Sequence, residues 1–115
     1  MNSLWTHGVA IALVMTLAED AMGKQKEADE IVRVLFGSLF GIPFQLFVRV
    51  LRLLGFLFVR QKGSHAIYRH SKLPEGLTVQ PDHNQDAKPY QVKQLRRLNA
   101  KYRWREQPGK TEKRH

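Results

Sequence analysis

One histidine of this chain stands in a setting that suits proton transfer. His65 follows Gly63 and Ser64, and three cations are near it in the sequence: Arg60, Lys62 and Arg69. Imidazole titrates near neutral pH, so it can take a proton from a hydroxyl or give one to a leaving oxygen. Positive side chains stabilise charge that develops on a phosphorus centre, and glycine lets the backbone approach a phosphate closely. Taken alone, however, an isolated strand histidine is more often structural than catalytic.

Two other histidines, His70 and His83, are interpreted as solvent-exposed or loop residues. Alternate side chains of a strand point to opposite faces, so His65 and His70 are expected on opposite sides of a sheet. Asp82 and Asp86 stand on either side of His83 in a loop, which is a weak pattern for metal ligands. We therefore expect no metal and no cofactor.

The net charge points to an anionic partner. The chain has 115 residues and a formal net charge of +9. After Gly55 there are fourteen Lys or Arg against five Asp or Glu, whereas the part up to Gly55 is balanced at five against five. Clustered cations attract phosphates and release counterions on binding, so RNA, an acidic protein or both are the natural ligands. The absence of cysteine excludes disulfides and cysteine nucleophiles.

The first part of the chain contains two candidate helices. The spacing of apolar residues predicts an amphipathic helix over residues 25–40. A second helix is predicted from Pro43 to Leu54, where apolar residues repeat at three- and four-residue steps. Gly55 follows as a typical residue after a helix end. The apolar run 8–17 is only ten residues long, much shorter than the roughly 20 needed to span a bilayer. We therefore do not expect a membrane as a partner, and we expect the protein to be located in the cytoplasm.

Strands and a last helix complete the expected module. Aromatic and β-branched residues predict strands over 56–61, 65–70 and 77–80, with a turn joining the first two. A helix beginning at Pro89 has an apolar stripe and a cationic outer face. The predicted fold class is α+β, with the order helix, three antiparallel strands, helix. The run 105–115 is interpreted as a disordered tail.

Two segments resemble a known toxin family. Residues 54–70, read as LGFLFVRQKGSHAIYRH, and residues 87–95, read as AKPYQVKQL, are similar to the HicA family of HicA/HicB toxin–antitoxin systems, and the likeness extends over about 42–102. The resemblance implies a fold like that of double-stranded RNA-binding domains, cleavage of mRNA, growth arrest and neutralisation by a HicB antitoxin. It also implies that His65 is the catalytic histidine, with Gly63 and Ser64 as its setting.

The resemblance divides the chain into three parts. Residues 1–41 are an N-terminal extension, either a helical addition or upstream sequence from a misplaced start. Residues 42–103 are the toxin domain and residues 104–115 a basic tail. Lys88 and Lys93 are further candidates for contact with mRNA or with the antitoxin. Two other functions stay open: a catalytically inactive RNA-binding module of the same fold, and a small membrane-surface protein.

Overall fold

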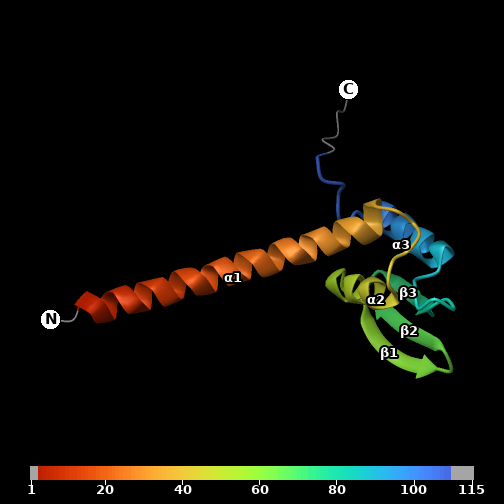
Figure 1. Cartoon of the computed structure of the whole chain (residues 1–115). Coiled ribbons are helices and arrows are strands. Elements are labelled where there is room, and N and C mark those ends of the chain that lie inside the picture. Colours follow the sequence, from red (N-terminus) through yellow and green to blue (C-terminus); the bar gives the residue numbers. More distant parts are fainter. Residues whose placement is uncertain (1–2, 110–115) are drawn as a thin grey trace.

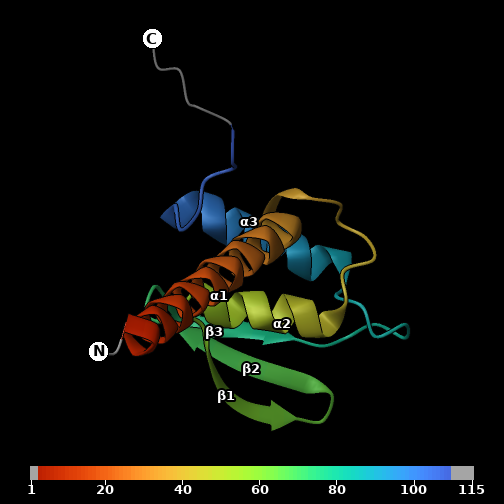
Figure 2. The same ribbon diagram turned by 60° about the vertical axis from the view of Figure 1, so that its left-hand side comes forward.

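The structure consists of one long helix that leads into a small α+β module. It is a computed structural model and describes residues 3–109. The elements follow one another as α1 (Ser3–Phe36), α2 (Phe44–Leu53), β1 (Leu57–Lys62), β2 (His65–His70), β3 (Leu73–Val79) and α3 (Pro89–Tyr102). The strands form an antiparallel sheet in the order β1-β2-β3. The helices lie on one side of it (Figures 1 and 2). The predicted α+β fold and element order are confirmed.

Helix α2 covers the sheet with the apolar stripe that the sequence predicts. Leu46, Phe47, Val50 and Leu51 are buried, and the helix ends where Gly55 adopts a positive φ of 101°. This positive φ favours glycine, and a Cβ at position 55 would also stand 3.0 Å from the His70 ring, which would have to shift. Val92 and Leu95 of α3 pack into the same core, together with Leu77 and Val79 of β3.

Helix α1 is much longer than the amphipathic helix expected over 25–40, and it ends earlier, at Phe36. Its last turns belong to the core, because Ile31, Val34 and Leu35 are buried beside α2 and α3. Arg96 of α3 caps its end by donating hydrogen bonds to the carbonyls of Val34 (3.0 Å) and Gly37 (2.8 Å). Burial lowers the pKa of the Arg96 guanidinium.

Strand β3 begins earlier than predicted. The stretch 71–76 was expected to be a loose connection, but pairing already starts between His70 and Leu73. An irregularity in the ladder between Tyr68 and His70 accommodates the residues around Pro74, whose exposed side chain fits an edge strand. Gly76 is essential to this arrangement, since a Cβ there would lie 2.8 Å from the Tyr68 carbonyl oxygen.

His70 is not the exposed residue that the sequence suggested. Its side chain is half-buried between Phe56 and Trp104, with ring centroids 4.8 and 4.5 Å away. Its Nε2 lies 2.9 Å from the Leu54 carbonyl oxygen, and its Nδ1 accepts a hydrogen bond from the Lys72 backbone N–H. The ring therefore joins the end of α2 to the sheet as a structural element.

The expected disordered tail does not begin at residue 105. The Arg105 backbone N–H donates to the Asn99 side chain, which donates in turn to the Arg105 carbonyl. Trp104 packs on Phe56 and Tyr102, with centroids 5.5 Å away in each case. These contacts hold the chain against α3 as far as Arg105. The end of the predicted tail, 110–115, lies outside the described residues.

Candidate catalytic face of the sheet

The side of the sheet that faces away from the helices carries His65. Along β2, Ala66 and Tyr68 are buried under the helices, whereas His65 and Arg69 are exposed and Ile67 is half-buried. Because strand side chains alternate, His65, Ile67 and Arg69 share the outer surface, which we call the open face. The prediction that His65 and His70 point to opposite sides is thereby confirmed.

A β-bulge in β1 turns Arg60, and with it Lys62, toward the open face. Phe58 pairs with Tyr68, but the next pair is Arg60 with Ile67, so Val59 is an extra residue in β1. Directly paired residues point to the same side of a sheet. Without the bulge, Arg60 would pair with Ala66 and turn toward the helices. With it, Arg60 lies beside Ile67 on the open face, two residues along from His65.

Lys62 is the cation closest in register to His65, because the two residues form the pair that closes the β1-β2 hairpin. Only Gly63 and Ser64 separate them, and Gly63 has a positive φ of 60°. A two-residue turn with glycine first is the pattern of a type II′ hairpin turn. Nothing lies within 4 Å of a Cβ built at position 63, so backbone conformation, and not crowding, calls for glycine. The turn fixes where Lys62 and His65 emerge.

Polar contacts tie this turn to β3 and α3. The Ser64 hydroxyl donates to the Gln80 side chain at 3.2 Å, and the Gln80 backbone N–H donates to the Gln91 side chain at 3.3 Å. Gln91 is buried, with 2% of its surface exposed, and donates to the Tyr90 hydroxyl. Gln80 and Gln91 were not singled out from the sequence, because neither residue type signals a side-chain contact between distant segments. The Ser64 hydroxyl therefore fixes the turn to the residue that follows β3.

The remaining candidates lie further from His65. Arg69 is on the open face but four residues along β2, at about 13 Å for a strand rise near 3.3 Å. Lys88 precedes α3 as its half-buried N-cap, and Lys93 is exposed on α3, in the helix layer. The structure therefore brings together His65, Lys62 and Arg60, with Arg69 further along the same face.

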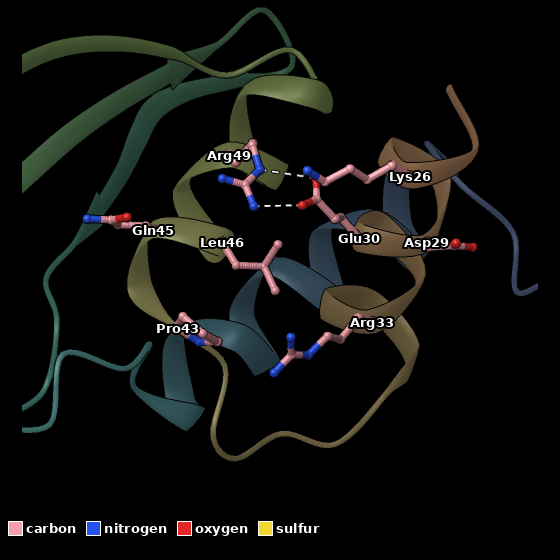
Figure 3. A pocket seen from close by; sticks show the side chains of 8 residues that line it. All are labelled: Lys26, Asp29, Glu30, Arg33, Pro43, Gln45, Leu46 and Arg49. Carbon is pink, nitrogen blue, oxygen red and sulfur yellow. Dashed lines mark hydrogen bonds and ion pairs between the residues drawn. The ribbon is translucent and has the colours of Figure 1, made fainter. Parts of the chain in front are cut away.

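Two cavities lie away from the open face. A groove of about 450 Å³ separates α2 from the helix-facing side of the hairpin and has Phe58 and Tyr68 in its wall. A polar pocket of about 390 Å³ lies between α1 and α2 (Figure 3), where Arg49 forms a bidentate ion pair with Glu30. The hydrogen bond from Arg49 lowers the pKa of the Glu30 carboxyl. His65 lines neither cavity.

Asp82 has a structural role in the loop before α3. One Asp82 oxygen accepts hydrogen bonds from the backbone N–H groups of Asn84 (2.8 Å) and Asp86 (2.9 Å), and these bonds lower the pKa of its carboxyl. His83 is exposed beside it. Within residues 3–109, no three His, Asp or Glu side chains gather as metal ligands would. Nor is any helix in this part of the chain long and apolar enough to cross a membrane.

The fold and this face define a class of protein: a small basic α+β module that presents one histidine among cations on an uncovered sheet. Residues 45–100 match the family model described as the HicA toxin of bacterial toxin–antitoxin systems. The match covers 56 of the 115 residues and supports a HicA-type toxin domain in this part of the chain. No curated protein and no solved structure matches the chain significantly.

Proposed function

We propose that this chain is the toxin of a type II toxin–antitoxin system and that it cleaves mRNA with His65 as general acid and base. One observation carries the proposal. His65 and Lys62 form a cross-strand pair at the tip of the open face, and the bulge at Val59 adds Arg60 to the same side. An exposed imidazole close to cations suits phosphodiester cleavage, because it can transfer the proton while the cations stabilise the developing negative charge.

Each residue of the face has a distinct proposed part. His65 takes the proton from a ribose 2′-hydroxyl or returns one to the leaving oxygen. Lys62 and Arg60 stabilise the negative charge that grows on the phosphoryl oxygens. Arg69 is too far along the strand to share that phosphate directly, so we assign it to a neighbouring phosphate of the same RNA. Gly63 and Ser64 hold the turn that presents His65.

The cleavage is proposed to need no metal ion. A 2′-hydroxyl supplies the nucleophile from the RNA itself, and the cations of the open face supply charge stabilisation. Activity that persists in excess EDTA supports this part of the proposal. Activity that disappears with EDTA and returns with Mg²⁺ refutes it.

The partners follow from the same face and from the family. Single-stranded mRNA would reach the open face directly, because no helix within residues 3–109 covers it (Figure 2). A HicB-type antitoxin would neutralise the toxin by covering the same residues. Lys88 and Lys93 are proposed as additional contacts with mRNA or antitoxin at the side of the module. The toxin domain of 42–103 is proposed to fold together with the last turns of α1, whose buried residues it surrounds.

Induced expression in bacteria tests the proposal. The full chain is expected to arrest growth, and His65→Ala to abolish the arrest at equal protein level. His83→Ala is the matched control, because His83 is an exposed loop histidine in the same domain. Equal arrest by the full chain and His65→Ala contradicts the catalytic role.

The rival function, RNA binding without cleavage, shares the fold and the charge. Purified full-length protein distinguishes the two when it is mixed with an end-labelled single-stranded RNA. Binding accompanied by shortening of the RNA supports the nuclease. Retarded but intact RNA supports the silent module.

A further inference from the structure

The groove between α2 and the β1-β2 hairpin combines side chains of the kinds that hold a nucleotide. Its volume of about 450 Å³ falls within the range of about 300–1,000 Å³ that is usual for small-molecule sites. Its walls include aromatic rings, glutamine amides and arginines, among them Phe58, Tyr68, Gln61 and Arg52. We call it the base groove. It lies on the helix-facing side of the hairpin, behind the open face.

Phe58 offers an aromatic surface to the base groove. It pairs with Tyr68 across the two strands, so both side chains point to the same side of the sheet. Their ring centroids are 5.5 Å apart at an interplanar angle of 70°, so the two rings meet edge to face and are not stacked. Phe58 is 50% exposed, although proteins usually bury phenylalanine. Its exposed half is therefore available to a second flat ring.

The Tyr68 hydroxyl makes no hydrogen bond within the described residues, although only 3% of Tyr68 is exposed. No side-chain polar atom in this part of the chain is both buried and without a partner. The small exposed area of Tyr68 therefore includes the hydroxyl, which opens into the base groove. Buried polar groups are nearly always hydrogen-bonded, and the edge of a nucleobase supplies suitable partners.

Gln61 connects the base groove to the turn that presents His65. It pairs with Ala66, and both residues line the groove. The Gln61 side chain donates to the Gly63 carbonyl at 3.1 Å, which leaves its amide oxygen available to a ligand. Lys62 and His65 form the next pair and point to the open face. The base groove and His65 therefore lie on opposite sides of the same hairpin end, one residue apart along β2.

The arginines favour a nucleotide over an acidic peptide as the occupant. Arg49 is engaged by Glu30 in a bidentate ion pair. Arg52 is exposed in the last turn of α2 and forms no ion pair within residues 3–109. One such cation suits the single phosphate of one nucleotide, whereas an acidic peptide would need several. The aromatic and amide groups suit the base of the same nucleotide.

We infer that the base groove binds the base of an RNA nucleotide that neighbours the cut bond, a position that rests on the proposed cleavage. The base stacks on Phe58, its edge bonds to the Tyr68 hydroxyl and to Gln61, and Arg52 contacts a phosphate. Strand β1 is at the edge of the sheet, so a single strand of RNA can pass around it from the open face (Figure 2). The groove would then set the sequence preference of the toxin.

Nuclear magnetic resonance of the full-length His65→Ala chain tests base binding without cleavage. The four ribonucleoside 5′-monophosphates and ribose 5-phosphate are titrated into the isotope-labelled protein. These ligands share the sugar and the phosphate, and ribose 5-phosphate lacks only the base. At least one nucleotide is expected to shift the signals of α2 and β1 around the groove, with an affinity about 5- to 100-fold above that of ribose 5-phosphate. Equal affinities, shifts confined to other surfaces, or no shifts overturn the inference.

Variants at position 58 separate stacking from plain apolar contact. Phe58→Trp keeps a flat ring and should retain the nucleotide, whereas Phe58→Leu keeps only an apolar side chain and should weaken binding by at least about 5-fold. Phe40→Ala is the matched control, because Phe40 is 70% exposed and lies outside the groove. Circular dichroism checks the fold of each variant. Equal nucleotide binding by Phe58→Trp and Phe58→Leu overturns the inference and favours an apolar protein segment as the occupant.

Tyr68→Phe tests the hydroxyl in the same titration. Because the hydroxyl makes no hydrogen bond within the described residues, its removal should leave the thermal midpoint unchanged. Nucleotide binding should weaken by about 2- to 10-fold, the usual effect of one hydrogen bond. Undiminished nucleotide binding by Tyr68→Phe overturns the contact assigned to this hydroxyl.

Cleavage by the chain with His65 intact separates failure of this inference from failure of the proposed function. The full chain should cut RNA at preferred sequences, and Phe58→Leu should change that preference. Cleavage without a preference, or with one that Phe58→Leu leaves unaltered, overturns the inference but not the nuclease. Nucleotide binding in the base groove of a chain that cuts no RNA refutes the nuclease and retains the groove as a site for an RNA base.

Discussion

Two N-terminal truncations of different length should show which part of α1 the module needs in order to fold. Ile31, Val34 and Leu35 are 7%, 0% and 2% exposed. Full burial of such a side chain stabilises a protein by about 1.5–3 kcal/mol, so the three together contribute roughly 5–9 kcal/mol. This is comparable to the whole free energy of unfolding of a small domain, about 5–15 kcal/mol. A chain without residues 1–41 should therefore be largely unfolded.

A chain that begins at Lys24 provides the contrast, because residues 10–23, which it lacks, are exposed. Its free energy of unfolding should stay within about 1 kcal/mol of the full chain, measured by urea denaturation with circular dichroism. Point variants make the same comparison without truncation. Leu35→Ala should cost about 2–5 kcal/mol and Leu13→Ala no more than about 0.5 kcal/mol. Equal stability of the full chain and the chain without 1–41 would refute the reasoning.

Three further predictions concern single contacts. Arg96→Ala should lower the free energy of unfolding by about 2–4 kcal/mol and Arg96→Lys by nearly as much, since lysine lacks the planar fork that reaches several carbonyls. The hydrogen bond from Arg49 lowers the pKa of the Glu30 carboxyl below 4.5, so the ionised Glu30 stabilises the fold above about that pH. The difference in free energy of unfolding between the full chain and Glu30→Gln should therefore shrink as the pH falls through the folded pKa, which urea titrations at several pH values measure. Gly76→Ala should lower the thermal midpoint by several degrees, because its Cβ meets the Tyr68 carbonyl; an unchanged midpoint would contradict the packing.

Local signals in the sequence were sufficient for most of the module. Helix α3 begins at Pro89 as predicted, and β2 spans His65–His70 as predicted, because capping, turn and alternation patterns act over a few residues. The α2 boundaries agree within one residue of the predicted Pro43–Leu54. The extent of α1 was missed because residues 10–18 are apolar on most sides, and a helix without a polar face lacks the period that identifies it.

The candidate site could be predicted only in part. The alternation of β2 predicts from sequence alone that His65 and His70 lie on opposite sides of the sheet, but not which side the helices cover. The bulge at Val59 has no signal in the residue types, since valine is a good strand former, yet it decides which way Arg60 points. The burial of Gln91 likewise depends on a partner, Gln80, eleven positions away. Features set by pairing between distant segments need the three-dimensional structure.

Cleavage of an end-labelled single-stranded RNA by purified full-length protein in EDTA tests the central proposal most directly. His65→Ala is expected to slow the cleavage by about 10²–10⁴-fold, the usual contribution of a general acid or base, while leaving RNA binding intact. His83→Ala should cleave at the rate of the unaltered chain. Cleavage by His65→Ala at an undiminished rate would contradict the assignment of proton transfer to this residue.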